Sequence, residues 1–392
     1  MAKRSITEAD VRGKRALIRV DFNVPLRNGE VADDTRIRAA LPTIQLLLDQ
    51  SAAVVLATHL GRPKGKPDPA YSVAPVARRL SELLGRPVAA VSVVAGAEAE
   101  RAANALRPGE VLLLENTRFE PGEELNAPDL AAALGRLGDL FVNDAFGAAH
   151  RAHASTVGVA SLLPAYAGLL LQREETALAR LLNNPERPFV AVLGGAKVSD
   201  KFAVLEHLLG RVDALLLGGG MANTVLLAQG HHIGSSLAEP DRVEDARRLI
   251  DSAGERGVLL ALPTDVVIAD SLNSTKSKVT PVSAIPADQA IFDIGPETVA
   301  RFCQQIADAR TIFWNGPMGV FEQGPFANGT LAIAHCVADA SAYTVIGGGD
   351  SLAAIEVAGV AERIDHISTG GGASLEYLEG RVLPGIAALP EA

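Results

Sequence analysis

The sequence predicts an α/β fold with two doubly wound, Rossmann-like parallel-sheet domains joined by a helical hinge. Short apolar, β-branched runs alternate with stretches of helical spacing along all 392 residues. The runs are apolar along their whole length, which suits parallel strands covered by helices on both faces. The chain is also longer than a single core, which stops growing at roughly 250 to 300 residues. Two domains are therefore expected.

The predicted strands form two series. Those of the first half cover 15–20, 53–58, 88–91, 111–114 and 140–143. Those of the second half cover 189–193, 214–217, 259–262, 311–314 and 343–346. A helical segment at about 170–182, followed by prolines, lies between the series and is the predicted connector. We therefore expect an N-terminal domain at 1–170, a connector and hinge at 171–188, and a C-terminal domain at 189–377.

Composition excludes several classes of protein. A hydrophobic fraction of 48% with 21% charged residues is typical of globular proteins. A net charge of -10 argues against a broad basic surface for nucleic acid. The longest apolar runs are far shorter than the ~20 residues of a membrane helix, and none follows the basic start as in a signal peptide. We expect a soluble cytoplasmic protein with no nucleic-acid or membrane partner.

The chain contains two cysteines, Cys303 and Cys336. They are too few, and too isolated in the sequence, for a disulfide framework or a zinc cluster. We expect both to be inert core thiols.

Polar and cationic side chains follow the predicted strands of the first half. Ligands of doubly wound sheets bind outside the carboxyl ends of the strands, and guanidinium groups pair bidentately with carboxylates and phosphates. Any one of these arginines, taken alone, is better explained by a surface ion pair. Independent surface pairs would not collect at one edge of a sheet, so an anion pocket is predicted there. His150 and His153 have a spacing that metal ligands use, but the intervening Arg151 favours contacts with an anion. The strand-end groups are Asp21-Phe22-Asn23, His59-Leu60-Gly61-Arg62, Glu115-Asn116-Thr117-Arg118 and His150-Arg151-Ala152-His153, with Arg36 soon after the first.

Glycine runs follow the predicted strands of the second half. Glycine lets the backbone approach phosphates closely, and the helix that follows offers free N–H groups. This half is interpreted as a nucleotide cradle, although neither GxxxxGK[ST] nor GxGxxG occurs. The runs are Gly194-Gly195-Ala196-Lys197, Gly218-Gly219-Gly220, Asn315-Gly316-Pro317-Met318-Gly319, Gly347-Gly348-Gly349 and Gly370-Gly371-Gly372.

The turn at Asp350 allows two interpretations. A carboxylate beside a glycine cradle suits Mg²⁺, which prefers one or two carboxylates plus substrate phosphates. Gly349-Asp350-Ser351-Leu352 also spells a signature of certain serine hydrolases. That reading needs a histidine with an orienting acid at a suitable spacing, whereas Asp365 and His366 are adjacent.

Longer blocks of the sequence resemble the phosphoglycerate kinase family over almost the whole chain. The resemblance implies reversible transfer of the acyl phosphate of 1,3-bisphosphoglycerate to ADP, giving 3-phosphoglycerate and ATP. It also implies direct in-line transfer on hinge closure with no covalent enzyme intermediate, a monomer, and a tail at 378–392 that folds back onto the first half. The blocks are Arg19-Val20-Asp21-Phe22-Asn23-Val24-Pro25, Thr58-His59-Leu60-Gly61-Arg62, Glu115-Asn116-Thr117-Arg118-Phe119, Ala149-His150-Arg151-Ala152-His153, Lys197-Val198-Ser199-Asp200-Lys201 and Asn315-Gly316-Pro317-Met318-Gly319-Val320-Phe321-Glu322.

The resemblance also implies roles for individual residues. The catalytic groups would be Arg36, Lys197 and the backbone N–H groups of Gly371 and Gly372, with Asp350 on Mg²⁺. The residues that bind the three-carbon acid would be Asp21, Asn23, Arg36, His59, Leu60, Gly61, Arg62, Arg118 and Arg151. The residues that bind ADP or ATP would be Gly195, Lys201, Gly219, Gly220, Asn315, Pro317, Glu322, Gly348, Gly349, Asp350 and Ser351.

Three positions depart from the family pattern. Ala148 and Ser351 stand where the family often has threonine, and Ile291-Phe292 stands where many members have a glycine near the adenosine. The base pocket is thus the part that the resemblance determines least. A second hypothesis is a non-catalytic relative that binds nucleotide as a partner protein. The presence of Lys197 and Arg36 argues against it.

Overall fold

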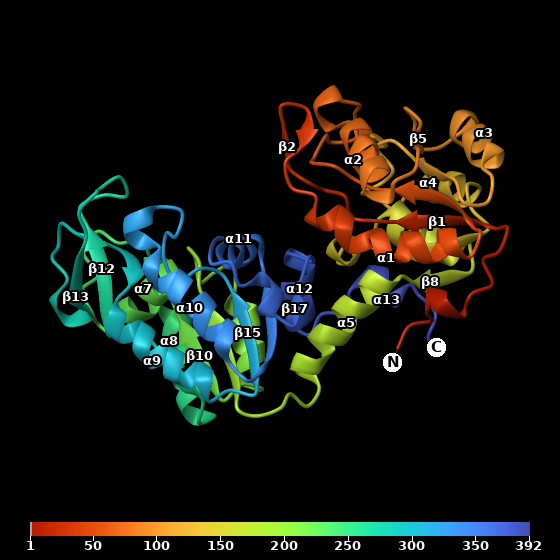
Figure 1. Cartoon of the computed structure of the whole chain (residues 1–392). Coiled ribbons are helices and arrows are strands. Elements are labelled where there is room, and N and C mark those ends of the chain that lie inside the picture. Colours follow the sequence, from red (N-terminus) through yellow and green to blue (C-terminus); the bar gives the residue numbers. More distant parts are fainter. Residues whose placement is uncertain (1) are drawn as a thin grey trace. The chain divides into compact units, whose positions relative to one another are not determined.

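The computed structural model describes residues 2–392, which form two compact units (Figure 1). Unit 1 comprises the chain up to Thr176 together with Val382–Ala392, and unit 2 comprises Ala177–Arg381. The first boundary falls inside one helix, α5 (Leu169–Leu182). Two covalent crossings therefore join the units, one through a helix and one at Arg381–Val382.

Unit 1 contains a six-stranded sheet in which every paired neighbour is parallel. Its order is β5 (Val88–Ala90), β6 (Val111–Leu113), β4 (Ala53–Ala57), β1 (Arg15–Arg19), β7 (Leu140–Asn143) and β8 (Ala165–Ala167). The helices of the unit are α1 (Thr35–Asp49), α2 (Ala74–Leu84), α3 (Ala97–Ala105), α4 (Pro128–Gly135) and the short α13 (Pro384–Ala387), and a two-stranded hairpin is formed by β2 (Leu26–Arg27) and β3 (Glu30–Val31).

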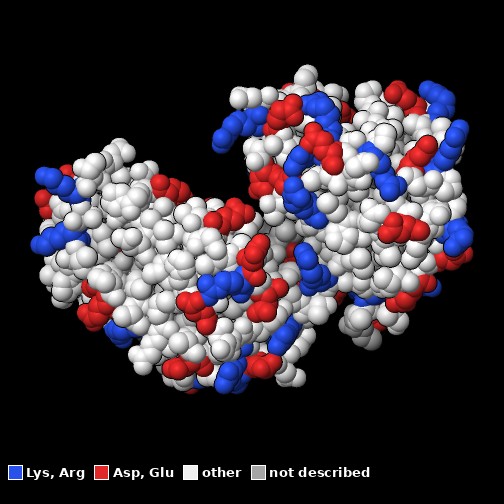
Figure 2. Space-filling model, viewed as in Figure 1, with Lys and Arg blue, Asp and Glu red and all other residues white. Residues whose placement is uncertain are grey.

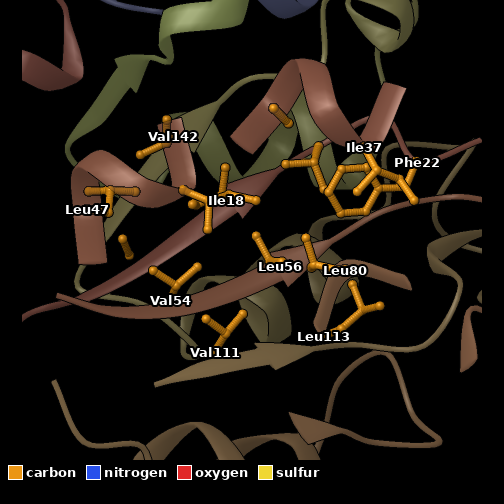
Figure 3. Close-up of a cluster of buried hydrophobic side chains, with 14 of the residues drawn as sticks. Ile18, Phe22, Ile37, Leu47, Val54, Leu56, Leu80, Val111, Leu113 and Val142 are labelled. Atoms are coloured by element: carbon orange, nitrogen blue, oxygen red, sulfur yellow. The ribbon is translucent and has the colours of Figure 1, made fainter. Parts of the chain in front are cut away.

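Apolar side chains bury both faces of this sheet. On one face, Ile18 of β1 and Leu56 of β4 belong to a cluster with Leu47 of α1 and Leu80 of α2 (Figure 3). The alternate strand positions point the other way and are buried as well; Leu17 is an example. Burial on both faces explains why the strand runs are apolar without alternation.

Unit 2 contains a second sheet of six parallel strands. Its order is β11 (Leu259–Ala261), β10 (Ala214–Leu217), β9 (Phe189–Leu193), β15 (Thr311–Asn315), β16 (Tyr343–Gly347) and β17 (His366–Ile367). The helices are α6 (Phe202–Leu209), α7 (Gly219–Ala228), α8 (Val243–Glu255), α9 (Pro296–Ala307), α10 (Asn328–Asp339), α11 (Gly349–Val357) and α12 (Gly372–Leu378). The predicted fold class is confirmed.

In each sheet the strand order reverses at the middle. Strands are added on one side of β1 and then, from β7, on the other; in unit 2 the same reversal lies between β9 and β15. Ligands of doubly wound sheets bind at such reversal points, outside the carboxyl ends of the strands. The topology therefore directs attention to the residues after β1, β7, β9 and β15.

Several strands were not predicted. β8 and β17 are edge strands of three and two residues, too short to give a periodic signal. Unit 2 also has a three-stranded antiparallel sheet, β13 (Lys278–Pro281), β12 (Asp265–Ala269) and β14 (Ala290–Ile294). None of the three was predicted: β13, at one edge, is mostly exposed and lacks an apolar run, whereas β12 and β14 do contain apolar residues and were overlooked.

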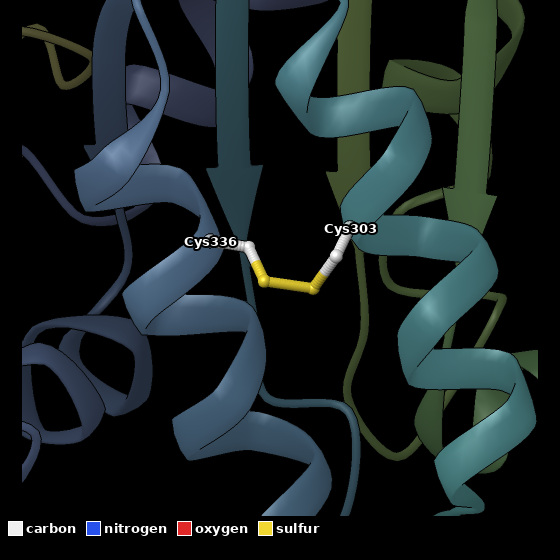
Figure 4. Close-up of a disulfide and its surroundings, with 2 residues drawn as sticks. All are labelled: Cys303 and Cys336. Atoms are coloured by element: carbon white, nitrogen blue, oxygen red, sulfur yellow. A yellow bond between two sulfur atoms is a disulfide. The ribbon is translucent and has the colours of Figure 1, made fainter.

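The expectation of inert thiols is wrong. Cys303 and Cys336 form a disulfide that joins α9 to α10, with Cα atoms 5.5 Å apart (Figure 4). A separation of 33 residues gives no cue in the sequence. The pairing arises because the two helices pack side by side over the core of unit 2.

The two ends of the described chain meet in unit 1. Lys3 forms a β-bridge with Glu391, and the backbone N–H of Arg4 donates to the carbonyl of Pro390 at 3.0 Å. None of the helices within residues 2–392 has the length and apolar character needed to cross a membrane. On the face that Figure 2 shows, acidic and basic side chains are interspersed over each unit.

Candidate active site

An ion pair lies at the carboxyl edge of the unit 1 sheet. Asp21, two residues after β1, accepts a 3.0 Å bond from Arg36, which lies in the first turn of α1. The Nδ1 atom of His59, after β4, lies 3.9 Å from the Asp21 carboxylate. Burial by itself raises the pKa of Asp21, but His59, Arg36 and Arg19 lower it, and the net pKa is below its ordinary value. A carboxylate thus faces the guanidinium group of Arg36 at this edge, with the buried cation Arg19 nearby.

A second set of bonds links the loops after β1, β4 and β6. Asn23 accepts from the backbone N–H of Gly61 at 2.8 Å, and Arg118 donates to the Gly61 carbonyl at 2.8 Å. Asn116, fully buried, accepts from the N–H of Leu60 and donates back to its carbonyl. The structure thus brings together the predicted group Asn23, Leu60, Gly61 and Arg118. Asn116 belongs to a predicted strand-end group but is not among the predicted site residues.

The two remaining predicted arginines, Arg62 and Arg151, are exposed. Within residues 2–392 neither side chain forms an ion pair. Arg118 differs, since its Nε lies 3.1 Å from Glu124. Burial, opposed by Glu124, lowers the Arg118 pKa. Arg118 thus forms the kind of surface ion pair that was the alternative to an anion pocket. Arg36 instead pairs with Asp21, another predicted site residue.

Behind this edge lie charged residues that the sequence analysis missed. Arg19, 1% exposed, donates to Ser155 and to the backbone carbonyl of Val20, and Glu123 is 0% exposed. Arg19 had a detectable signal, because a charged residue inside an apolar strand run is rarely buried without a partner. Glu123 had none, because it lies in a loop beside a second glutamate.

In unit 2 the loops after β9, β15 and β16 are bonded to one another. Lys201 donates through Nζ to the carbonyls of Gly194 at 2.6 Å and Asn315 at 3.1 Å. Asn315 in turn donates to Gly347 at 2.8 Å, and Ser351 accepts from the N–H of Gly316 at 2.5 Å. Burial lowers the pKa of Lys201 to about 8, against the opposing effect of Asp350 and Asp200.

Several glycines of this edge have no room for a side chain. An added Cβ at Gly316, where φ is +92°, would lie 2.3 Å from the carbonyl oxygen of Gly194. At Gly219, with φ of +65°, it would lie 2.7 Å from the oxygen of Gly195, and at Gly220 it would lie 2.3 Å from that of Ala196. The Gly195 N–H is bonded to Pro317 at 3.1 Å. Close backbone approach therefore explains these glycines.

Asp350 lies in the first turn of α11 and is exposed. Gly348 before it has φ of +94°, and an added Cβ at Gly349 would meet no atom within 4 Å, so the space beside Asp350 is open. Within residues 2–392 no group of three or more His, Cys, Asp or Glu side chains could hold a metal by itself. One carboxylate beside open space fits Mg²⁺, which takes further ligands from phosphates.

Four of the predicted residues lie outside the hydrogen bonds described above. Lys197 is exposed, on a loop that Ser199 fixes by bonds of 2.9 and 2.5 Å to Glu239. Glu322 is exposed after β15, and Gly371 precedes α12 with φ of +55°. Gly372 begins that seven-residue helix.

The departure at Ile291-Phe292 lies in β14 of the antiparallel sheet. The Ile291 N–H donates to Ser236 at 2.8 Å, and the Phe292 ring lies 4.8 Å from that of Phe326. The N–H of Val320 donates to the carbonyl of Phe292 at 2.8 Å, which ties this strand to the loop after β15.

Two doubly wound sheets, one with a cationic edge and one with a glycine-rich edge, are typical of α/β proteins that bind phosphate-bearing ligands. A sequence model of the phosphoglycerate kinase family matches residues 6–381. The chain belongs to the phosphoglycerate kinase family, whose members are glycolytic kinases with ADP and ATP as co-substrates.

Curated relatives and solved structures agree with this assignment. The phosphoglycerate kinases of Roseiflexus castenholzii and Chloroflexus aurantiacus are 60% and 59% identical over 395 and 399 residues, covering 100% of both chains. The solved structure from Coxiella burnetii is 45% identical, with a TM-score of 0.89 over 98% of each chain. That from Pyrococcus horikoshii is 35% identical, with a TM-score of 0.88 over 98% of each chain.

Proposed function

We propose that unit 1 binds the three-carbon acid at the carboxyl edge of its sheet. Arg62, Arg118 and Arg151 would hold its phosphate, and Asp21, Asn23 and His59 its carbon skeleton. The observation that carries the proposal is the Asp21–Arg36 pair at the β1 end, at 3.0 Å, with the exposed arginines Arg62 and Arg151. Exposed guanidinium groups without an internal partner are suited to bidentate anion contacts.

Unit 2 would bind ADP or ATP along its glycine edge. The phosphates would lie against the close-packed glycines Gly195, Gly219 and Gly220 and against the first turn of α11, whose N-terminal N–H groups favour anions. Lys201, already bonded to two carbonyls of this edge, would add a cation beside them. The remaining nucleotide contacts would come from Asn315, Pro317, Glu322, Gly348, Gly349 and Ser351.

Asp350 would hold Mg²⁺ together with the nucleotide phosphates. Bound there, the ion would neutralise charge on the transferred group. The enzyme's own contribution is the exposed carboxylate of Asp350 and the open space at Gly349.

The reaction would be direct in-line transfer between the acid and the nucleotide, with no covalent enzyme intermediate. The moving group resembles metaphosphate, with charge on its equatorial oxygens, so positioning and neutralisation are the main requirements. Lys197 and Arg36 supply cations, and the N–H groups of Gly371 and Gly372 supply fixed donors. A coupled assay for ATP formation from 1,3-bisphosphoglycerate tests this; nucleotide binding without turnover would contradict it.

Closure of the two units is part of the proposal, because the acid and the nucleotide are assigned to different units. Transfer needs reacting atoms roughly 3 to 3.5 Å apart and water excluded. α5 and the crossing at Arg381–Val382 would then act as the hinge. Small-angle scattering should give a smaller radius of gyration with both substrates bound than with either alone. An unchanged radius with 3-phosphoglycerate and a Mg²⁺-nucleotide analogue would contradict closure.

We further propose that the enzyme acts as a cytoplasmic monomer without a nucleic-acid partner. The interspersed charge on the face that Figure 2 shows and a net charge of -10 support the absence of a nucleic-acid partner. The disulfide argues against a cytoplasmic location, because disulfides are rare in the cytoplasm outside hyperthermophiles. Thiol counting in freshly lysed cells, before and after reduction, tests whether the bond exists in the compartment where the enzyme works.

A further inference from the structure

A buried chain of hydrogen bonds runs behind the acid edge of unit 1. Glu123 accepts from the backbone N–H of Ser155 at 3.0 Å and from its hydroxyl at 2.5 Å. Ser155 Oγ accepts a 2.7 Å bond from Nε of Arg19, and the other end of the guanidinium lies 3.1 Å from Nδ1 of His59. Glu123, Ser155 and Arg19 are each at most 2% exposed. None of these three has a role in the function proposed above.

The chemistry of the donors fixes the direction of every bond in this chain. A guanidinium group only donates, so Nδ1 of His59 must accept from Arg19. Burial, together with the cations Arg19, Arg118 and Arg36, lowers the pKa of His59 well below its ordinary value, against the effect of Asp21. A neutral imidazole that accepts at Nδ1 carries its proton on Nε2. His59 is therefore left with an Nε2–H group as its remaining donor for an anion.

The charge of Glu123 also bears on Asp21. Burial lowers the pKa of Arg19, whereas the carboxylates of Glu123 and Asp21 raise it. Asp21 is already bonded to Arg36 at 3.0 Å. If Glu123 were uncharged, Arg19 would be a buried cation drawn to Asp21, because removing one partner of a buried pair leaves the other charge uncompensated. Arg19 would then compete with Arg36 and release His59.

We propose that Glu123 is a positioning residue of the acid site. Acting through Ser155 and Arg19, it holds His59 in the tautomer that offers Nε2–H and leaves Asp21 to Arg36. The inference rests on the proposed binding of the acid at this edge and adds the residues that preorganise it.

The chain offers a matched control at the next position. Glu124 is also a glutamate, but its side chain is 54% exposed and lies beside Arg118. In the full chain, Glu123→Gln should raise KM for 3-phosphoglycerate about 10-fold and leave KM for Mg²⁺-ATP within about two-fold, since only the acid edge loses a charge-assisted bond. Glu124→Gln should change both KM values by less than about two-fold. Equal effects of the two substitutions, or a parallel rise in KM for ATP, would overturn the proposal.

A second measurement reads the tautomer directly in the enzyme without substrates. Nitrogen-15 NMR of the ring nitrogens of His59, assigned with His59→Gln, should show protonation at Nε2 in the wild type and loss of that preference in Glu123→Gln. Ser155→Ala should change the His59 tautomer to the same extent. Combining Glu123→Gln with Ser155→Ala should change the tautomer no further than either single substitution. An unchanged tautomer in Glu123→Gln, or additive effects, would overturn the relay.

The same spectra separate this inference from the proposed function. If 3-phosphoglycerate leaves the His59 signals of the wild type unmoved while Glu123→Gln still shifts the tautomer, the acid site is wrongly placed and the relay stands. If 3-phosphoglycerate moves the His59 signals of the wild type but Glu123→Gln leaves the tautomer unchanged, the acid site stands and the relay is wrong.

Discussion

The proposed ligand-binding edges of the two units are formed by different chemical groups, which are charged side chains in unit 1 and mainly backbone groups in unit 2. At the edge of unit 1, charged side chains project from the strand ends, and a buried layer of Arg19, Ser155 and Glu123 supports them. At the edge of unit 2, backbone groups come together where glycines exclude any side chain, as at Gly316 and Gly219. Side-chain cations can rotate and need partners to fix them, whereas backbone N–H groups are fixed by the turn itself. Preorganisation of the proposed ligand edges thus comes from a second layer of charges in unit 1 and from chain geometry in unit 2.

Lys197 is the exception in unit 2, because the proposed function gives a flexible, exposed side chain the main catalytic role there. Lys197→Ala should lower kcat on the order of 10³-fold while changing nucleotide affinity little, by analogy with charge-stabilising arginine fingers. Steady-state kinetics in both directions and direct ADP titration measure the two effects. Near wild-type turnover would remove Lys197 from the mechanism.

The arginines of unit 1 should divide into two groups. Arg36→Ala should mainly lower kcat, by about 10- to 100-fold, because its contact matters most near the reacting end. Arg62→Ala and Arg118→Ala should mainly raise KM for the acid by a similar factor, since they bind ground and transition states alike. Initial-rate kinetics with 3-phosphoglycerate varied at saturating Mg²⁺-ATP resolve the two patterns. Equal effects of all three on kcat would show that the roles are wrongly divided.

Gly316→Ala tests whether close backbone approach organises unit 2. The new Cβ would lie 2.3 Å from the Gly194 oxygen and 2.6 Å from Lys201 Nζ, so the loop must shift. We expect KM for the nucleotide to rise about 10-fold, from strain on the order of 1 to 3 kcal/mol, with KM for the acid unchanged. Gly324→Ala is the control, because its Cβ would meet no atom within 4 Å. A similar loss in both variants would point to general destabilisation instead.

Asp350→Asn should weaken use of the Mg²⁺-nucleotide complex several-fold while leaving affinity for 3-phosphoglycerate nearly unchanged. The reason is that the carboxylate belongs to unit 2 and the acid residues to unit 1. Rates measured across a Mg²⁺ titration in both proteins provide the test. An unchanged Mg²⁺ dependence would make the turn at Asp350 purely structural.

The smallest expected effect concerns pH. Because burial brings the pKa of Lys201 to about 8, the ammonium loses its proton as pH rises from 7 to 9. Affinity for free ADP should then fall a few-fold over this range, since a neutral amine no longer attracts phosphate. Lys201→Arg should flatten the profile, because guanidinium stays charged. An equally steep profile for both proteins, measured by calorimetry, would assign the titration to another group.

Prediction of the strands succeeded where one chain segment carries the whole signal. The apolar runs of β1 and β16 each lie in one continuous stretch, and the blocks that follow them, Asp21-Phe22-Asn23 and the glycines at 347–349, lie at or next to the strand ends as expected. Edge strands such as β17 and the polar strand β13 escaped because two to four residues without an apolar run carry no period.

By itself, the sequence determined the fold class, the family, and which strand ends carry arginine and which carry glycine. Local patterns and contiguous motifs contain that information. The tertiary structure alone decided that Cys303 and Cys336 pair, that Arg19 faces His59, and that Glu123 rather than Glu124 lies buried behind them. The physical reason is that these contacts join residues from 32 to 136 positions apart. Their partners are chosen by helix packing and strand order, which no short window of sequence records.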